Sequence, residues 1–156
     1  MYLGGMVVGP VAPVVSFLDA LVLDLQRTLP ADGRGCVLTT SFSKEDQILT
    51  WAVLESGIDV EIVSLDTGCL FPATRQTWSE TERHFGISIR SLMPDPSDLE
   101  GLGDLSEIYG SAAARKACCS VRKIKPLKRA CAGKSWWLTG LRKAHSNNRA
   151  GMQKIE

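Results

Sequence analysis

Short apolar runs alternate with longer helical segments along this chain, and that alternation constrains the fold more than any other feature. The apolar runs predict strands at residues 35–40, 60–65, 87–92 and 135–139. Helical spacing and helix-ending glycines predict helices at residues 14–28, 45–56, 73–85 and 118–131. We expect Pro126 to end or kink the last helix, and residues 93–103 to form a loop. The alternation predicts an α/β fold with a doubly wound parallel sheet.

A chain of 156 residues suits one domain with its own core. We expect that domain to occupy residues 14–156, preceded by an apolar lead-in at residues 1–13. The lead-in lacks a basic start, is broken by Pro10 and Pro13, and is too short to span a bilayer. A net charge of +1 without a charged tail gives no nucleic-acid signature, and we expect no membrane partner. The five cysteines lack disulfide-framework spacing, which favours a reducing, cytoplasmic location.

Three loops follow predicted strands and should meet at one edge of the sheet, where ligands bind in such folds. In the first, Ser41 and Ser43 precede a helix N-terminus, which can cradle phosphate or sulfate. The alternative is that Ser43 only caps that helix. The second loop contains Asp66, Thr67 and Gly68, which could bond a nucleotide or simply form an Asx turn.

The third loop gathers basic side chains: Arg142, Lys143, His145 and Arg149. Arginine binds phosphate through two parallel hydrogen bonds, although a solvated basic loop is the simpler alternative. The sequence contains no Ser-His-Asp arrangement and no histidine spacing typical of a metal site.

Cys118 and Cys119 are adjacent, and six basic residues lie between Arg115 and Lys128. Such a setting lowers thiol pKa values and favours thiolates, which ligate metals or attack electrophiles. Packing of two small apolar side chains on a basic helix is the alternative, and the pair alone does not decide between them.

Four motifs in the same order resemble the iron–sulfur adenylyl-sulfate (APS) reductase group of the phosphosulfate reductase family. They are Ser41-Phe-x-x-Glu45-Asp46, Leu65-Asp-Thr-Gly-x-Leu-Phe-Pro72, Arg115-Lys-x-Cys-Cys-x-x-Arg-Lys-x-x-Pro-Leu-x-Arg129 and Thr139-Gly-Leu-Arg-x-x-x-Ser146-x-x-Arg149-Ala. The resemblance implies an adenine nucleotide alpha hydrolase-like fold of the PP-loop superfamily. It implies substrate binding by Ser41, Phe42, Ser43, Glu45, Asp46, Leu65, Asp66, Thr67, Gly68, Arg142 and Arg149.

The resemblance also implies a reaction. A cysteine thiolate would attack the sulfur of adenosine 5′-phosphosulfate, AMP would leave, and thioredoxin or a similar dithiol would release sulfite from S-sulfocysteine for cysteine biosynthesis. Cys118 and Cys119 would supply two of the four ligands of a 4Fe-4S cluster. Arg122 and Lys123 would lie beside it and support catalysis, with Lys123 bridging electrostatically toward the substrate. The basic surroundings suit such a cluster, because four thiolates make it anionic.

The family's second cysteine pair and its C-terminal nucleophile have no counterpart in these residues, so we expect the chain to be truncated and inactive alone. Cys36 and Cys131 are interpreted as structural, and Cys69 as a reactive thiol rather than the nucleophile. Ala73 and Arg75 stand where the family usually has Glu and Tyr. A 3′-phosphoadenosine 5′-phosphosulfate reductase and a non-catalytic nucleotide-binding module stay open, as does a homo-oligomer. An adenylating pyrophosphatase is disfavoured, because its glycine-rich loop is replaced at residues 41–44.

Overall fold

A computed structural model describes residues 16–103, 108 and 110–141 of the chain. Its four-stranded sheet has the order β3-β2-β1-β4, and every neighbouring pair is parallel. The strands are β1 (Cys36–Thr40), β2 (Glu61–Leu65), β3 (Arg90–Leu92) and β4 (Trp136–Thr139). The chain builds outward from β1 through β2 to β3 and then returns to place β4 on the other side of β1. The predicted α/β fold with a parallel, doubly wound sheet is confirmed.

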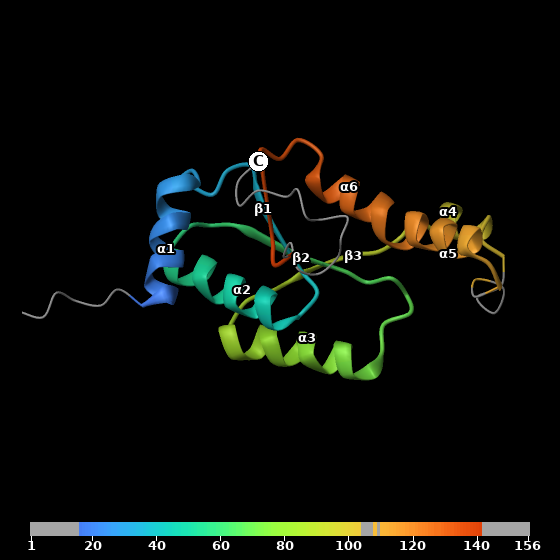
Figure 1. Ribbon diagram of the computed structural model, residues 1–156, viewed down its shortest axis with the longest axis horizontal. Coiled ribbons are helices and arrows are strands. Elements are labelled where there is room, and N and C mark those ends of the chain that lie inside the picture. The colour runs from blue at the N-terminus through green and yellow to red at the C-terminus, as the bar shows by residue number, and fades with distance from the viewer. Residues whose placement is uncertain (1–15, 104–107, 109, 142–156) are drawn as a thin grey trace, which may run out of the picture.

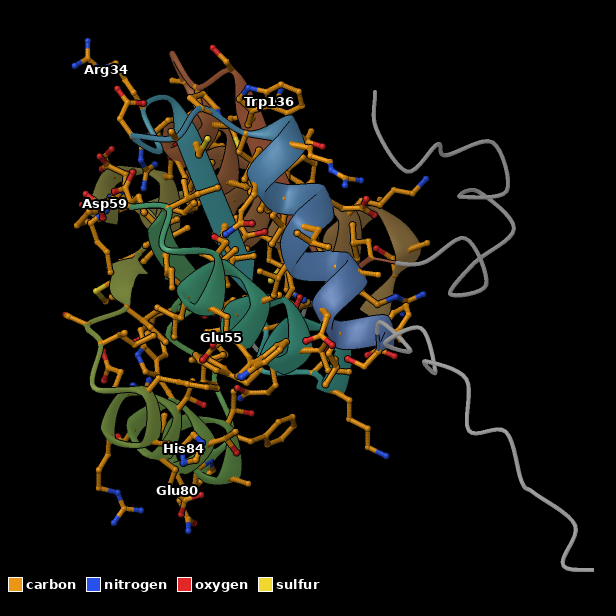
Figure 2. All side chains as sticks on the ribbon, turned by 90° about the vertical axis from the view of Figure 1, so that its left-hand side faces the viewer. Arg34, Glu55, Asp59, Glu80, His84 and Trp136 are labelled. Carbon is orange, nitrogen blue, oxygen red and sulfur yellow. The ribbon has the colours of Figure 1, made fainter. Side chains whose placement is uncertain are left out.

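Helices cover both faces of the sheet (Figure 1). One face is covered by α1 (Phe17–Thr28), α2 (Lys44–Ser56) and α3 (Pro72–Phe85). The other carries a long helical rod made of α5 (Ala112–Cys119), the π-helical turn η2 (Ser120–Ile124) and α6 (Lys125–Cys131), with the short α4 (Pro96–Glu100) beside it. Figure 2 shows Glu80 and His84 on the outer side of α3, where both side chains are exposed.

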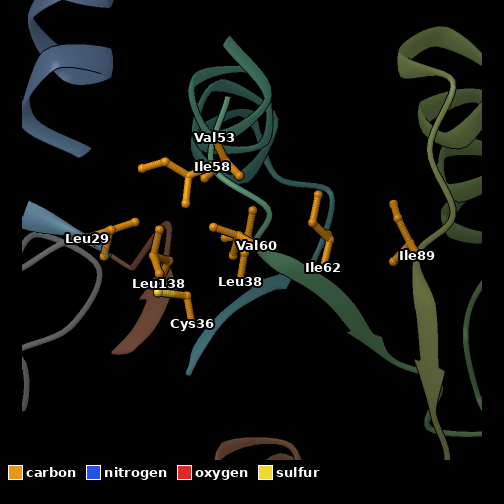
Figure 3. Close-up of a cluster of buried hydrophobic side chains, with 9 residues drawn as sticks. All are labelled: Leu29, Cys36, Leu38, Val53, Ile58, Val60, Ile62, Ile89 and Leu138. Atoms are coloured by element: carbon orange, nitrogen blue, oxygen red, sulfur yellow. The ribbon is translucent and has the colours of Figure 1, made fainter. Parts of the chain in front are cut away.

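Alternate residues of the strands point to opposite faces and form two apolar clusters. The larger cluster lies beneath α2 and includes Leu38, Val53, Ile62 and Leu138 (Figure 3). The smaller lies beneath α6 and joins Val37, Val63 and Leu92 to Ala130. Leu38 and Val37 are neighbours in β1 and are both fully buried, so this central strand is sandwiched between the two layers.

Two elements differ from the sequence-based prediction. The third strand begins only at Arg90, and the backbone N–H of the preceding Ile89 donates to Glu82 Oε1 at 2.8 Å. The expected loop at residues 93–103 contains α4, which Asp95 caps by accepting the N–H of Ser97 at 3.0 Å. Pro96 then occupies the first helical position, where a missing N–H costs nothing.

Pro126 distorts the rod, as expected, but does not end it. Proline has no N–H to donate to the carbonyl four residues earlier, so a regular helix cannot pass through it unchanged. The preceding turn widens to the π form, in which the N–H of Lys125 donates to Ser120 O. The rod also begins earlier than predicted, at Ala112 rather than Cys118.

Candidate functional site

The carboxyl ends of all four strands meet at one edge of the sheet because every strand runs in the same direction. Residues 41–43 follow β1, residues 66–71 follow β2, and Gly140 follows β4. Since β1 has β2 on one side and β4 on the other, the strand order reverses here, and ligands bind at such a reversal in open α/β sheets.

The loop after β1 holds a strained turn. Phe42 has a φ of +63°, which is unusual for a residue with a side chain. Its N–H donates to Thr40 Oγ1 at 3.1 Å, and its ring lies 5.3 Å from that of Trp78. Ser43 then caps α2 by accepting the N–H of Asp46 at 3.3 Å, so the cap that the sequence left as an alternative is present. The N-terminus of α2, which attracts anions, therefore faces this edge.

Two acidic residues occupy the first turn of α2. Glu45 is half-buried, whereas Asp46 is 5% exposed. Asp46 Oδ2 accepts the N–H of Ser41 at 2.7 Å and its hydroxyl at 2.6 Å, while Oδ1 accepts the N–H of Gly140 at 3.0 Å. This carboxylate thus joins the loop after β1 to the chain that leaves β4.

The loop after β2 is also organised around a carboxylate. Leu65 ends β2 and packs against the smaller cluster, and Asp66 is buried next to it. Asp66 Oδ1 accepts the N–H of Gly68 at 3.0 Å, which is the Asx turn that the sequence left open. Arg75 of α3 pairs with the same carboxylate, with Nη1 3.2 Å from Oδ2. The sequence showed Arg75 only as a departure from the family pattern, and its role as the counter-charge of Asp66 was missed.

The rod with the paired cysteines is fastened to this second loop. Arg122 Nη1 donates to the backbone carbonyl of Thr67 at 2.7 Å, and Thr67 is buried. Cys118 is half-buried and Cys119 is exposed, and both lie within one turn of Arg122 along the rod. Lys123 is exposed. The rod that bears the paired cysteines is therefore bonded to the loop after β2 through Arg122.

The remaining cysteines differ in burial. Burial raises the pKa of the Cys36 thiol and that of the Cys131 thiol, so both stay protonated at neutral pH. That protonation agrees with a packing role. Cys69 is exposed on the second loop, where its N–H donates to Thr67 Oγ1 at 3.2 Å.

The fit to a metal cluster is partial. Within residues 16–103, 108 and 110–141, no group of three or more His, Cys, Asp or Glu side chains could hold a metal ion. Cys118 and Cys119 are both free thiols, so this part of the chain offers at most half of a four-thiolate site.

Most of the predicted substrate-binding residues gather at the carboxyl edge of the sheet, in the loops after β1 and β2 or at the start of α2: Ser41, Phe42, Ser43, Glu45, Asp46, Leu65, Asp66, Thr67 and Gly68. Arg142, Lys143, His145 and Arg149 lie outside the described residues. No helix in the described part of the chain has the length and apolar character needed to cross a bilayer.

Comparison with known families gives one match over most of the chain. The model of the phosphoadenosine phosphosulfate reductase domain matches residues 35–156. The chain is 44% identical over 122 residues to the adenosine 5′-phosphosulfate reductase of Sinorhizobium fredii (strain USDA 257), covering 76% of this chain and 48% of that protein. The reductase of the same name from Allochromatium vinosum is 38% identical over 135 residues, covering 85% of this chain and 53% of that protein. The chain thus spans about half the length of the curated relatives it matches.

Proposed function

Because this chain belongs to the phosphoadenosine phosphosulfate reductase domain family, we propose that it forms the nucleotide-binding part of a thiol-dependent reductase of adenosine 5′-phosphosulfate. The observation that carries the proposal is the hydrogen bond from Arg122 to Thr67 O. It joins the cysteine pair to a strand-end loop, so a bound phosphosulfate would lie between an anion-attracting helix end and the thiols.

The proposed reaction proceeds in two balanced steps. A cysteine thiolate attacks the sulfur of the phosphosulfate, an S–S bond forms, and the S–O bond to AMP breaks as AMP leaves with the electron pair. A dithiol such as thioredoxin then attacks the S-sulfocysteine and releases sulfite, and the dithiol is oxidised to a disulfide. Sulfite formed in this way in the cytoplasm would serve sulfate assimilation and cysteine biosynthesis.

The chain's own residues have a defined share in this reaction. The first turn of α2, with its backbone N–H groups and the hydroxyl of Ser43, would bind the anionic groups, whereas the Ser41 hydroxyl is already donated to Asp46. The loop that begins at Asp66 would position the nucleotide through its backbone, because the Asp66 carboxylate is already paired with Arg75. Basic side chains near the thiols would offset the repulsion between thiolate and phosphosulfate.

Cys118 and Cys119 would supply two ligands of a 4Fe-4S cluster, and the other two thiolates would come from outside this 156-residue sequence, whose five cysteines all lie in the described residues. When bound, such a cluster would add an anionic centre that Arg122 and Lys123 neutralise. Iron and acid-labile sulfide analysis of anaerobically purified protein, with Cys118→Ser and Cys119→Ser as variants, tests this assignment. Iron and sulfide that both variants retain would contradict it.

Isothermal titration calorimetry of the purified chain tests nucleotide recognition. We expect adenosine 5′-phosphosulfate to bind, and to bind more tightly than its 3′-phosphorylated form. Arg122→Met should weaken binding about ten-fold, since it releases the loop from the rod. Lys128→Met, which removes an exposed cation from the same rod, is the matched control and should change little. Equal losses in the two variants would show that only general charge matters.

A non-catalytic nucleotide-binding module is the second candidate. It is favoured because the described residues contain no group of three or more side chains that could hold a metal ion. We expect no sulfite release from labelled adenosine 5′-phosphosulfate by these 156 residues with thioredoxin. Turnover by this chain would refute that expectation. Nucleotide binding without iron would favour the non-catalytic module.

A further inference from the structure

Asp46 poses an electrostatic problem for an anion-binding edge. Its carboxylate lies in the first turn of α2, at the helix end proposed above to receive the phosphosulfate, and it is only 5% exposed. A free carboxylate in that position would repel the ligand. The family resemblance places Asp46 among the substrate-binding residues, but the structure gives its oxygen atoms other partners.

Both carboxylate oxygens accept hydrogen bonds from the protein. Oδ2 takes the N–H and the hydroxyl of Ser41, at 2.7 and 2.6 Å, and Oδ1 takes the N–H of Gly140 at 3.0 Å. Ser41 follows β1 and Gly140 follows β4, so the bonds cross the point where the strand order reverses. Three donors converge on one buried anion, which offsets much of the cost of its burial.

The approach of Gly140 is too close for any other residue. A Cβ atom built at Gly140 would lie 2.5 Å from Asp46 Oδ1 and 2.9 Å from its backbone nitrogen. The backbone at Gly140 is thus held directly against the start of α2. In sequence, Gly140 stands two positions before Arg142, which begins the basic segment.

We propose that Asp46 is a positioning residue that holds the loop after β1 against the chain leaving β4, and that it makes no contact with the nucleotide. It would fix the spacing between the anion-binding end of α2 and Gly140, where the chain leaves β4. This inference rests on the proposed nucleotide binding but adds a residue role to it.

Asp46→Asn separates the two roles by the sign of its effect. If the carboxylate only repelled the ligand, removing its charge would tighten the binding of AMP and adenosine 5′-phosphosulfate. In the positioning role, the amide NH₂ of asparagine would face one of the three protein donors, and the two loops would separate. Binding would then weaken about ten-fold, equivalent to about 1.4 kcal/mol.

Adenosine distinguishes positioning from direct contact. If Asp46 bonded the ribose or the base, Asp46→Asn would weaken adenosine binding as strongly as AMP binding. In the positioning role, the loss is confined to the ligands that carry phosphate. An equal loss for adenosine would overturn the proposal, as would tighter AMP binding.

Asp19 provides a matched control. Asp19 Oδ2 accepts the N–H of Ser16 at 3.1 Å and its hydroxyl at 2.8 Å in an exposed capping box, so the same two donor groups of a serine bond an aspartate, with no bond from another element among the described residues. Asp19→Asn should leave nucleotide binding unchanged. Ser41→Ala should weaken it a few-fold and Ser41→Thr should restore it; failure of that rescue would count against the proposal. Should Asp46→Asn fail to fold, judged by circular dichroism, this Ser41 pair carries the test.

Amide NMR tests the bond without a ligand. In Asp46→Asn, the amide signals of Ser41 and Gly140 should both shift and exchange faster with solvent, while those of α1 stay in place. An unchanged Gly140 amide would overturn the proposal. If the wild-type chain binds no adenylate, the proposed function fails, and the NMR measurement still decides whether Asp46 joins the two loops.

Discussion

Gly33 offers a sharp test of how the start of the sheet is packed. It precedes β1, has a φ of +65°, and its N–H donates to Pro30 O at 2.9 Å. A Cβ atom there would lie 1.9 Å from the backbone oxygen of Asp59, which stands just before β2. Gly33→Ala would therefore force apart two backbone segments that have no flexible side chain between them.

The variant Gly57→Ala is the control for Gly33→Ala, because it has the cost of the left-handed backbone conformation without the clash. Gly57 has a φ of +72°, and no atom lies within 4 Å of a Cβ built on it. Gly57→Ala should therefore lower the free energy of unfolding by about 1 kcal/mol, the cost of a left-handed alanine. Gly33→Ala bears that cost and a further ~1–3 kcal/mol for overpacking against a fixed carbonyl. We expect a total loss of about 2–4 kcal/mol.

Urea unfolding followed by far-UV circular dichroism measures both variants, provided that the slope of the free energy against urea is unchanged. The expected result is a midpoint for Gly33→Ala well below that of Gly57→Ala. If the two variants agree within about 0.5 kcal/mol, the close approach of Gly33 to Asp59 is refuted.

Leu38→Ala should lower the free energy of unfolding by about 2–5 kcal/mol, because Leu38 is fully buried in the central strand. Urea titration measures this loss, and a loss below about 1 kcal/mol would contradict a core on both faces of the sheet. The pKa of the Glu61 carboxyl is lowered, chiefly by the hydrogen bond from Lys134. Ionised Glu61 therefore stabilises the fold fully above the unfolded pKa of about 4.3, and this stabilisation is lost as the pH falls through the lower folded pKa. The stability difference between wild type and Glu61→Gln should shrink over that range, and a difference that grows in acid would reverse the sign of the argument. Mass-mapped alkylation of metal-free protein should modify exposed Cys69 quickly and Cys36, which is 1% exposed, last; the opposite order would contradict their placement.

The sequence was sufficient for features set by local rules. Periodicity and end signals located α2 and α3, with Gly57 and Gly86 ending them in left-handed conformations. The run of residues 35–40 is buried on both faces, as expected for a central parallel strand. The topology that brings the loops after β1 and β2 to one edge follows from the same alternation.

Contacts between residues far apart in the sequence could not be predicted from local sequence patterns. The bond between Gly140 and Asp46 spans 94 positions, and that between Arg122 and Thr67 spans 55, so no local pattern could indicate either. Arg75 was visible only as an unusual residue, because its role depends on how α3 turns back toward Asp66. Sequence motifs located the loops of the candidate site but not the contacts that hold them together.

These contacts also change how the charge of the site is understood. Two aspartates lie at an edge proposed to bind an anion, and a count of residues alone would predict repulsion there. Asp66 is compensated by Arg75 and the N–H of Gly68, and Asp46 by three donors. The charge of each carboxylate is therefore compensated by donors within the protein, and each carboxylate orders a loop. The N-terminal end of α2 keeps its attraction for anions. An acidic residue in such a loop is thus compatible with phosphosulfate binding as long as its own donors stay in place.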